Sequence, residues 1–315
     1  MQAAISNVKQ RILVLGAGEL GLAVLRGLAA RSTETASISV LLRPTTVQAS
    51  SAAKQQEIAA IRGLGVAIEV ADITDASVTD LAAVLGRFDT VISCVGFAAG
   101  RGTQRKLTEA ALVSGVTRYI PWQFGVDYDV IGRGSPQDLF DEQLDVRDLL
   151  RAQSRTEWVI ISTGMFSSFL FDADFGVVDV PNGRVNALGN LTTRVTVTTP
   201  QDIGTLTAAI VLHSPRIINQ VVYTAGDTLT YGDVADLLER VTLRKIERRT
   251  LGVKRLQAEL EESPDDNLRK YRAVFAQGHG VAWDVANTFN ALEGISVTRA
   301  EQWAMSNLRD NARAF

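Results

Sequence analysis

Hydrophobic and polar positions along the first half of the chain alternate in blocks typical of a parallel α/β fold. Short runs that are apolar on both faces have the length of strands, and longer amphipathic segments follow them. The predicted strands are residues 11–15, 38–42, 67–71, 90–96, 118–121 and 158–163. The predicted helices are residues 22–30, 52–64, 78–85, 104–114 and 139–152. Because strands apolar on both faces need helices on both sides, we predict a Rossmann-type, doubly wound parallel sheet.

The regular alternation ends near residue 164. Beyond it, short strand patterns at 195–198 and 220–223 precede helical patterns at 231–241, 253–262, 268–275 and 300–308. This part is expected to form a smaller α+β lobe that binds the substrate. We therefore place a nucleotide-binding domain at residues 1–165 and the substrate lobe at 166–315, with segments near 195–215 able to return to the first domain.

The first predicted strand runs into a glycine-rich turn, G-x-G-x-x-G, formed by Gly16, Gly18 and Gly21. Gly16 permits a tight turn, Gly18 lets a pyrophosphate approach the backbone, and Gly21 lets the helix pack closely on the strand. The free N–H groups at the start of that helix favour phosphate. Glu19 and Leu20 belong to the same cofactor-binding turn, where a carboxylate must point to solvent or weaken the field on the phosphate.

The residue that ends the second strand indicates which dinucleotide binds. Sites for NAD carry an acid there that bonds the ribose 2′-hydroxyl. This chain has Arg43 instead, whose guanidinium can pair with a 2′-phosphate through two charge-assisted bonds. Lys54 adds a second positive charge if the intervening segment folds back, although either cation could simply be solvated. The cofactor is therefore predicted to be NADP(H).

Further cofactor contacts are expected after the third and fourth strands. Asp72, followed by Ile73, could accept a bond from the adenine amino group, although an Asp that opens a turn is ordinary turn chemistry. Cys94, Val95 and Gly96 end the fourth strand, where the backbone should run beside ribose and phosphates. A lone cysteine in an apolar strand more commonly fills the core than acts as a nucleophile.

Composition excludes several other classes of function. A net charge of −3 gives no reason to expect a nucleic acid or an anionic membrane as partner, and no apolar run approaches the length of a membrane span. One cysteine and no signal-like start favour a cytoplasmic protein without disulfides. The two histidines, His213 and His279, lack metal-ligand spacing, so no metal site is expected.

Several segments together resemble the NmrA-like, isoflavone-reductase-like group of atypical short-chain dehydrogenases. The matching pieces are the glycine turn, Leu42-Arg43, the segment 72–75, Gln104, the segment 116–127 and Asp202-Ile203-Gly204. The most specific is 116–127, similar to the family pattern V-K-R-F-x-P-S-E-F-G-x-D. The resemblance implies a Rossmann lobe, NADPH and a small aromatic or phenolic substrate. It also places Gln104, Gln123 and Phe124 among the cofactor-binding residues.

The chain departs from that family at chemically important positions. Leu15 replaces a glycine, Trp122-Gln123 replaces Ser-Glu, and Gln143 stands where a K-x-x-x-R pattern has its lysine. A glutamine amide can orient a bound group but cannot act as a general acid. Gln143 is therefore one candidate catalytic residue. Tyr128, a potential phenolic donor, is the other, although a tyrosine at such a position is more commonly a surface or lobe-contact residue.

The segment after the sixth strand is a candidate substrate site. Met165, Phe166 and Phe169 lie in an aromatic-rich loop that would suit a flat apolar substrate, unless these side chains only hold the two lobes together.

Three functions fit the sequence. The first is an NADPH-dependent reductase of a small aromatic alcohol, carbonyl or ether-type substrate, possible as a homodimer. The second is a regulator of NmrA type that binds NADP(H) without chemistry and passes its redox state to a protein partner. The third is a non-redox isomerase or cyclase that retains the cofactor.

Overall fold

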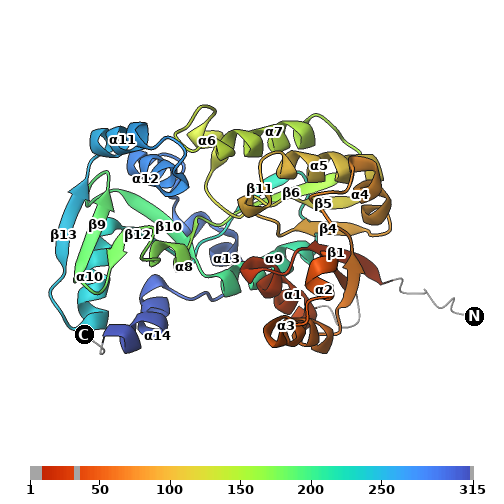
Figure 1. The fold of residues 1–315 in the computed structure, drawn as a ribbon, viewed down its shortest axis with the longest axis horizontal. Helices are drawn as coiled ribbons and strands as arrows, with labels where there is room; N and C mark the ends of the chain where they lie inside the picture. The colour runs from red at the N-terminus through yellow and green to blue at the C-terminus, as the bar shows by residue number, and fades with distance from the viewer. Residues whose placement is uncertain (1–8, 32–35, 313–315) are drawn as a thin grey trace, which may run out of the picture. The chain divides into compact units, whose positions relative to one another are not determined.

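The computed structural model describes residues 9–31 and 36–312 (Figure 1). Its contacts divide the chain into two compact units, and each contains discontinuous segments. Unit 1 comprises residues 1–122, 145–160 and 203–221. Unit 2 comprises residues 123–144, 161–202 and 222–315. Both units therefore draw on early and late parts of the sequence.

A seven-stranded sheet forms the centre of unit 1, with the strand order β11-β6-β5-β4-β1-β2-β3. Its strands are β1 (Gln10–Leu15), β2 (Ala36–Leu42), β3 (Ala67–Val70), β4 (Thr90–Ser93), β5 (Arg118–Ile120), β6 (Glu157–Ser162) and β11 (Gln220–Tyr223). All pairings from β3 across to β6 are parallel, with Val14 of β1 opposite Val40 and Ile92. Reversal of strand order beside β1 is the doubly wound arrangement, so the predicted fold class is confirmed.

Helices cover both faces of this sheet. They are α1 (Glu19–Arg31), α2 (Pro44–Val47), α3 (Ala52–Gly63), α4 (Val78–Leu85), α5 (Thr103–Ser114), α7 (Leu139–Arg151) and α9 (Pro200–Val211), with a 3₁₀ turn η1 (Phe97–Ala99). Figure 1 shows α4, α5 and α7 on one face and α1 and α9 on the other. On the first face, Leu13, Val91 and Tyr119 of the sheet pack with Leu107 and Val146 in one core of fully buried side chains.

Local sequence explains where these helices begin and end. Ser77 and Asp80 form a capping box at the start of α4, and Ser51 accepts from the backbone of Lys54 at the start of α3. Gly115 ends α5 in the left-handed conformation, which glycine adopts without a Cβ penalty. Strand β4 is shorter than predicted because its partner β1 ends at Leu15, opposite Ser93, and the chain then bends toward η1.

Unit 2 contains two smaller, three-stranded sheets. One has the order β12-β10-β7 and the other β13-β9-β8. The strands are β7 (Met165–Phe166), β8 (Val178–Asp179), β9 (Arg184–Leu188), β10 (Arg194–Thr198), β12 (Asp227–Thr230) and β13 (Glu247–Leu251). Its helices are α6 (Tyr128–Ile131), α8 (Ser167–Leu170), α10 (Tyr231–Thr242), α11 (Val253–Glu262), α12 (Asn267–Gln277), α13 (Phe289–Leu292) and α14 (Ala300–Ala312), with a 3₁₀ turn η2 (Val285–Asn287).

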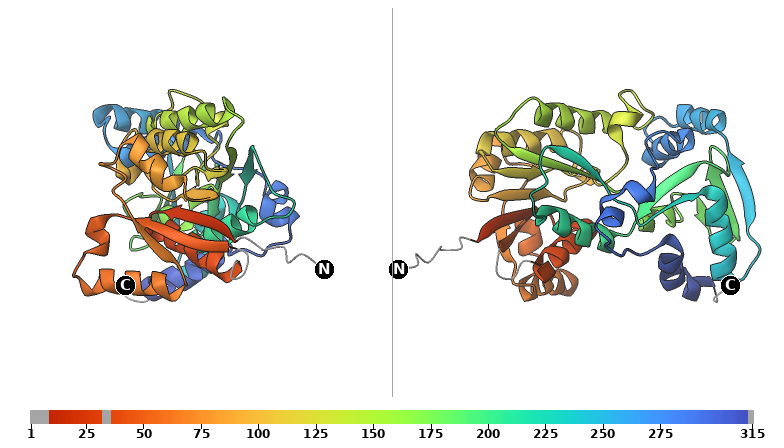
Figure 2. Two further views of the ribbon diagram at one scale, coloured as in Figure 1. Left: turned by 90° about the vertical axis from the view of Figure 1, so that its right-hand side faces the viewer. Right: turned by 180° about the vertical axis from the view of Figure 1, so that it is seen from behind.

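The two opposite views in Figures 1 and 2 show β9 beside β13, although long segments separate them in the chain. The segment after β6 is not the loop expected from its composition. Met165 pairs with Val197 of β10, so residues 165–166 form a strand, and one helical turn, α8, follows.

Candidate functional site

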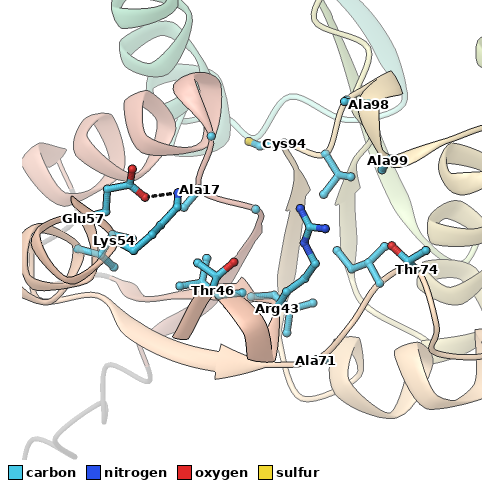
Figure 3. A pocket seen from close by; sticks show the side chains of 18 of the residues that line it. Ala17, Arg43, Thr46, Lys54, Glu57, Ala71, Thr74, Cys94, Ala98 and Ala99 are labelled. Carbon is cyan, nitrogen blue, oxygen red and sulfur yellow. Dashed lines mark hydrogen bonds and ion pairs between the residues drawn. The ribbon is translucent and has the colours of Figure 1, made fainter. Parts of the chain in front are cut away.

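Unit 1 contains a pocket of about 550 Å³ at the carboxyl ends of its central strands. Its walls come from the glycine turn, the end of β2, the α2–α3 segment and the residues that follow β3 and β4 (Figure 3). The lining residues are Gly16, Ala17, Gly18, Leu41, Leu42, Arg43, Thr46, Lys54, Glu57, Ile58, Ile61, Ala71, Ile73, Thr74, Cys94, Val95, Gly96, Ala98 and Ala99. The carboxyl end of a doubly wound sheet is where ligands bind in this architecture.

The glycine turn has the backbone geometry that its sequence predicts. Gly16 has a φ of +85°, and its N–H donates to the carbonyl of Leu41 over 3.1 Å. A Cβ on Gly21 would lie 2.2 Å from the carbonyl oxygen of Gly16, so only glycine lets α1 approach the turn this closely. A Cβ on Gly18 would meet no atom of the described residues within 4 Å. The backbone at Gly18 is thus open toward the pocket, as a site for a bound phosphate requires.

Glu19 and Leu20, although adjacent to these glycines, do not line the pocket. Glu19 is exposed in the first turn of α1, which is one of the two placements expected for it, and Leu20 is buried. Their assignment as cofactor contacts stays a prediction.

Arg43 places a cation in the pocket. Its extended backbone ends β2 and caps α2, whose first residue is Pro44. The side chain is exposed, and among the described residues no carboxylate or carbonyl pairs with its guanidinium. An unpaired guanidinium at this position suits the doubly charged phosphate of an NADP ribose, which can accept two parallel bonds.

Lys54 also lines the pocket, but it has a partner. Its Nζ lies 2.7 Å from Oε2 of Glu57, one turn later on α3. In the view of Figure 3 this pair lies on the other side of Thr46 from Arg43. The segment does fold back to bring Lys54 into the pocket, yet with its charge offset by a carboxylate.

The residues after β4 form another wall. Cys94 is buried, and its burial raises the pKa of the thiol, which argues against a nucleophilic role. Val95 and Gly96 line the pocket next to it. Gln104 does not line the pocket. Its buried Nε2 instead donates to the carbonyl of Val95 over 2.8 Å and so fixes the backbone of this wall.

Trp122, where the family pattern has Ser, packs behind the same wall. Its ring is edge-on to Phe97 at 4.7 Å, and a Cβ on Gly96 would lie 3.1 Å from the indole. Gly96 therefore leaves room for this large side chain, which explains how unit 1 accommodates the departure from the pattern.

Of the two residues expected after β3, Ile73 lines the pocket and Asp72 does not. The Asp72 carboxylate accepts the backbone N–H of Thr74 at 2.8 Å, which is the turn chemistry weighed from the sequence, and Asp72 does not line the pocket. Ile73 lines the pocket and also belongs to the core of unit 1.

Four candidate residues lie in unit 2: Gln123, Phe124, Tyr128 and Gln143. All four are buried, and Nε2 of Gln123 donates to the backbone carbonyl of Gln143 over 2.8 Å. The Gln143 side chain is fully buried, and its amide nitrogen and oxygen have no hydrogen-bond partner among the described residues. Tyr128 packs edge-on against Phe140 at 5.0 Å. The structure therefore brings Gln123 and Gln143 together, while Tyr128 has the packing environment of a core residue.

The candidate substrate residues belong to the packing of unit 2. Met165 is buried, whereas Phe166 and Phe169 are partly exposed. Phe169 stacks on Phe175 with ring centroids 4.4 Å apart and meets Tyr271 edge-on at 5.6 Å. These contacts favour a packing role within this unit for Phe169, and substrate contact by the three residues stays a prediction.

Several pocket residues were not predicted from sequence. Thr46, Ile58, Ile61, Ala98 and Ala99 line it, as does Glu57. Glu57, Ile58 and Ile61 could have been found from the helical spacing, because they follow Lys54 by three, four and seven positions on α3. Thr46 and the alanines give no comparable signal.

The described residues contain neither a cluster of metal ligands nor a helix that could span a membrane. In residues 9–31 and 36–312, no three His, Cys, Asp or Glu side chains lie close enough to hold a metal ion. Across the same residues, no helix has the length and apolar character needed to cross a bilayer.

The fold and the pocket together define a Rossmann-type protein with a pocket at the carboxyl edge of its sheet, where ligands bind in this architecture. The model of the NmrA-like family matches residues 8–279, and the chain belongs to this family.

The chain is 45% identical to an NmrA-like family domain-containing oxidoreductase of Gibberella moniliformis, over 94% of this chain and 97% of that protein. It is 25% identical to the isoflavone reductase homolog P3 of Arabidopsis thaliana, over 86% of this chain and 88% of that protein. Its fold is similar to that of the binary complex of leucoanthocyanidin reductase with NADPH from Vitis vinifera. That match has a TM-score of 0.76 and 20% identity, and it covers 93% of this chain and 97% of the other.

Proposed function

We propose that this protein is an NADPH-dependent reductase that acts on a small aromatic substrate of phenolic, alcohol, carbonyl or ether type. The observation that carries the proposal is the Arg43 guanidinium, which has no partner among the described residues and lines a pocket that also contains the open backbone of Gly18. The names of the relatives support the class of reaction, since they are an oxidoreductase and reductases, one of them in complex with NADPH.

The residues of unit 1 fit the adenosine half of such a cofactor. Arg43 would hold the 2′-phosphate, and the N–H groups at the start of α1 beside Gly18 would hold the pyrophosphate. Ile58 and Ile61 offer an apolar wall for the adenine. When bound, NADPH supplies a hydride to the substrate. We also propose that the aromatic substrate contacts Met165, Phe166 or Phe169 of unit 2.

Gln143 distinguishes this protein within the proposal. Its amide can donate one hydrogen bond and accept another, but it carries no proton to release at neutral pH. We infer that Gln143 orients a bound group, and that the proton needed in a reduction comes from another donor or from water. Tyr128 remains the second candidate for that donor.

The primary test is calorimetric titration of the purified protein with NADP⁺ and with NAD⁺. We expect Arg43→Ala to weaken NADP⁺ binding by about 10- to 100-fold, because a charged hydrogen bond is worth about 1.5–3 kcal/mol. Binding of NAD⁺ should change by less than about twofold, since it lacks the 2′-phosphate. Arg43→Lys should give an intermediate loss, because a lysine keeps the charge but not the planar fork.

Arg26→Ala is the matched control, because Arg26 is exposed on α1 and does not line the pocket. Equal loss for NADP⁺ and NAD⁺ in the Arg43 variant would contradict the assignment of the 2′-phosphate. Absence of NADP⁺ binding by the unmodified protein would overturn the proposed cofactor.

A second function is favoured by one observation. Gln143 replaces the lysine that reductases of this family place in a K-x-x-x-R pattern, and a protein that only senses NADP(H) needs no proton donor there. The two functions separate when NADPH consumption is followed by its absorbance with a panel of aromatic ketones, quinones and benzylic ethers. Turnover supports the reductase. Tight cofactor binding without turnover, together with a protein partner whose affinity depends on the redox state of the nucleotide, supports the regulator.

A further inference from the structure

The pocket of unit 1 contains one feature that the need for a phosphate site does not explain. Among its lining residues, all of which lie in the described part of the chain, Glu57 is the one with a carboxylate. A negative charge in a site for a phosphate lowers the affinity for that phosphate, because like charges at short distance repel. A carboxylate in this wall therefore affects how strongly the pocket can bind a phosphate.

Glu57 is placed to act through Lys54. The two residues are one helical turn apart on α3, and their side chains meet at 2.7 Å. Ser51 caps this helix and accepts the N–H of Lys54, which fixes where the pair begins. The Lys54 and Glu57 side chains are 46% and 41% exposed, so the pair is weak and its lysine can exchange one anion for another.

The two cations of the pocket therefore differ. Arg43 has no partner among the described residues, whereas Lys54 is held by a carboxylate (Figure 3). When a phosphate enters, Arg43 can bind it at once. Lys54 can bind it only by leaving Glu57, and the released carboxylate then stays near the phosphate.

We propose that Glu57 is a specificity-determining residue that lowers the affinity of this pocket for the 2′-phosphate by holding Lys54 in an ion pair. This inference rests on the proposed function, since it concerns the same dinucleotide. In this arrangement the preference for NADP(H) comes mainly from Arg43. Lys54 is a second cation, and its pairing with Glu57 limits how much it contributes to binding the phosphate. A site built in this way discriminates between NADP(H) and NAD(H) while keeping the phosphorylated cofactor exchangeable.

The test is Glu57→Gln, which removes the charge and keeps both the shape and the helix propensity of the side chain. The probes are NADP⁺ and adenosine 2′,5′-bisphosphate, compared with NAD⁺ and 5′-AMP, each titrated by calorimetry at low ionic strength. We expect the variant to bind the two 2′-phosphorylated probes about fivefold more tightly, the scale of one exposed ion pair. The other two probes should change by less than about twofold, and the gain should shrink as salt is added.

Glu109→Gln is the matched control. Glu109 forms a similar exposed pair with Arg105 on α5, at 2.8 Å, and does not line the pocket. The same change of net charge should leave all four affinities unaltered. A gain in this control equal to that of Glu57→Gln would overturn the inference, because it would show a general effect of charge.

The double variant Lys54→Gln, Glu57→Gln tests the route through the lysine. If Glu57 acts by holding Lys54, the double variant loses the gain and returns to within about twofold of the unmodified protein. A gain that persists without Lys54 overturns the inference.

The inference and the proposed function fail in different ways. If the unmodified protein binds no NADP⁺, the proposed function fails. If it binds NADP⁺ and Arg43→Ala weakens that binding, but Glu57→Gln changes nothing, only the role of Glu57 is overturned.

Discussion

The Gln143 side chain is buried in unit 2 with both polar atoms of its amide unpartnered among the described residues. An amide that is buried without a partner costs about 1–3 kcal/mol, so we expect the Gln143 side chain to lower the stability of the fold while nothing is bound. Groups that cost stability cluster at functional sites, and we therefore expect Gln143 to contact a bound group.

Substitution of Gln143 is expected to have different effects on stability and on activity. Gln143→Leu should leave the free energy of unfolding unchanged or raise it by about 1 kcal/mol, because leucine has a similar volume and no polar atoms to satisfy. Turnover of the aromatic substrate should fall if the amide orients a bound group. Urea unfolding measures the first effect and steady-state kinetics the second.

Gln123→Leu is the control, because it removes the donor to the backbone carbonyl of Gln143. This variant should lose about 1 kcal/mol of stability. A loss of more than about 2 kcal/mol in Gln143→Leu would show that the amide is satisfied in solution, and the functional argument would then fail.

Individual residues differ in how well sequence predicts their position. Arg43 could be predicted to lie in the pocket because it ends a strand next to a glycine turn, and that arrangement is local. The pairing of Lys54 with Glu57 is also local, because the two residues are one helical turn apart, and their spacing alone predicts the contact. The burial of Gln143 and Tyr128 depends on packing of distant segments, and no spacing in the sequence reports it.

At the level of the element, the strand–turn–helix from β1 to α1 uses two glycines for opposite reasons. The packing of α1 against the turn requires glycine at position 21, because a Cβ there would lie 2.2 Å from the carbonyl oxygen of Gly16. A Cβ on Gly18 would meet none of the described atoms within 4 Å, so the packing of the fold does not require glycine there. The missing side chain instead leaves room for a ligand beside the backbone. The same motif thus contains one glycine that the packing of α1 requires and one that we propose for ligand binding.

Two alanine substitutions test this separation. Gly21→Ala should destabilise the protein by about 2–3 kcal/mol, because backbone atoms have to move to make room. Gly18→Ala should change stability by less than about 1 kcal/mol, yet weaken the binding of both NADP⁺ and NAD⁺, since the methyl group faces the pyrophosphate position. Thermal unfolding and calorimetry measure the two effects. Loss of stability in Gly18→Ala as large as in Gly21→Ala would contradict the distinction.

Elements with strong local signals were predicted well, and elements that depend on distant partners were not. The strands and helices of residues 10–162 alternate in the sequence as they do in the fold, because each carries its own hydrophobic period. Strand β9 is only five residues long and pairs with β13, which lies far along the chain. Helix α9 was not predicted either, since its apolar residues follow an irregular segment with no strong boundary signal.

At the level of the whole molecule, unit 1 is completed by a helix from late in the chain. The backbones of α1 and α9 touch: a Cβ on Gly204 would lie 2.2 Å from the carbonyl oxygen of Ala23, and one on Gly27 2.4 Å from that of Gly204. This contact gives the Asp-Ile-Gly sequence at 202–204 a structural reason. Two glycines face each other where side chains would separate the helices.

We therefore expect Gly204→Ala to lower the free energy of unfolding by about 2–3 kcal/mol, the typical cost of overpacking a close contact. Gly63→Ala is the matched control, because Gly63 lies in α3 and a Cβ there would meet no atom within 4 Å. That variant should be neutral or stabilised by up to about 1 kcal/mol. Equal effects of the two substitutions in urea unfolding would refute the close approach of α1 and α9.

The fold class could be predicted from sequence, because strands apolar on both faces leave few other architectures. The discontinuity of both units could not, since it depends on which late segments return to which sheet. Residues 203–221, for example, belong to unit 1 although they follow a long segment of unit 2.

The backbone contact between α1 and α9 has a practical consequence for dissecting this protein. A fragment that stops before α9 lacks both that helix and β11. The edge of the large sheet at β6 and the surface of α1 at Gly27 would then be exposed to solvent. Such a piece should aggregate when produced alone. A soluble nucleotide-binding fragment would have to be made by circular permutation or by supplying the missing stretch as a separate peptide.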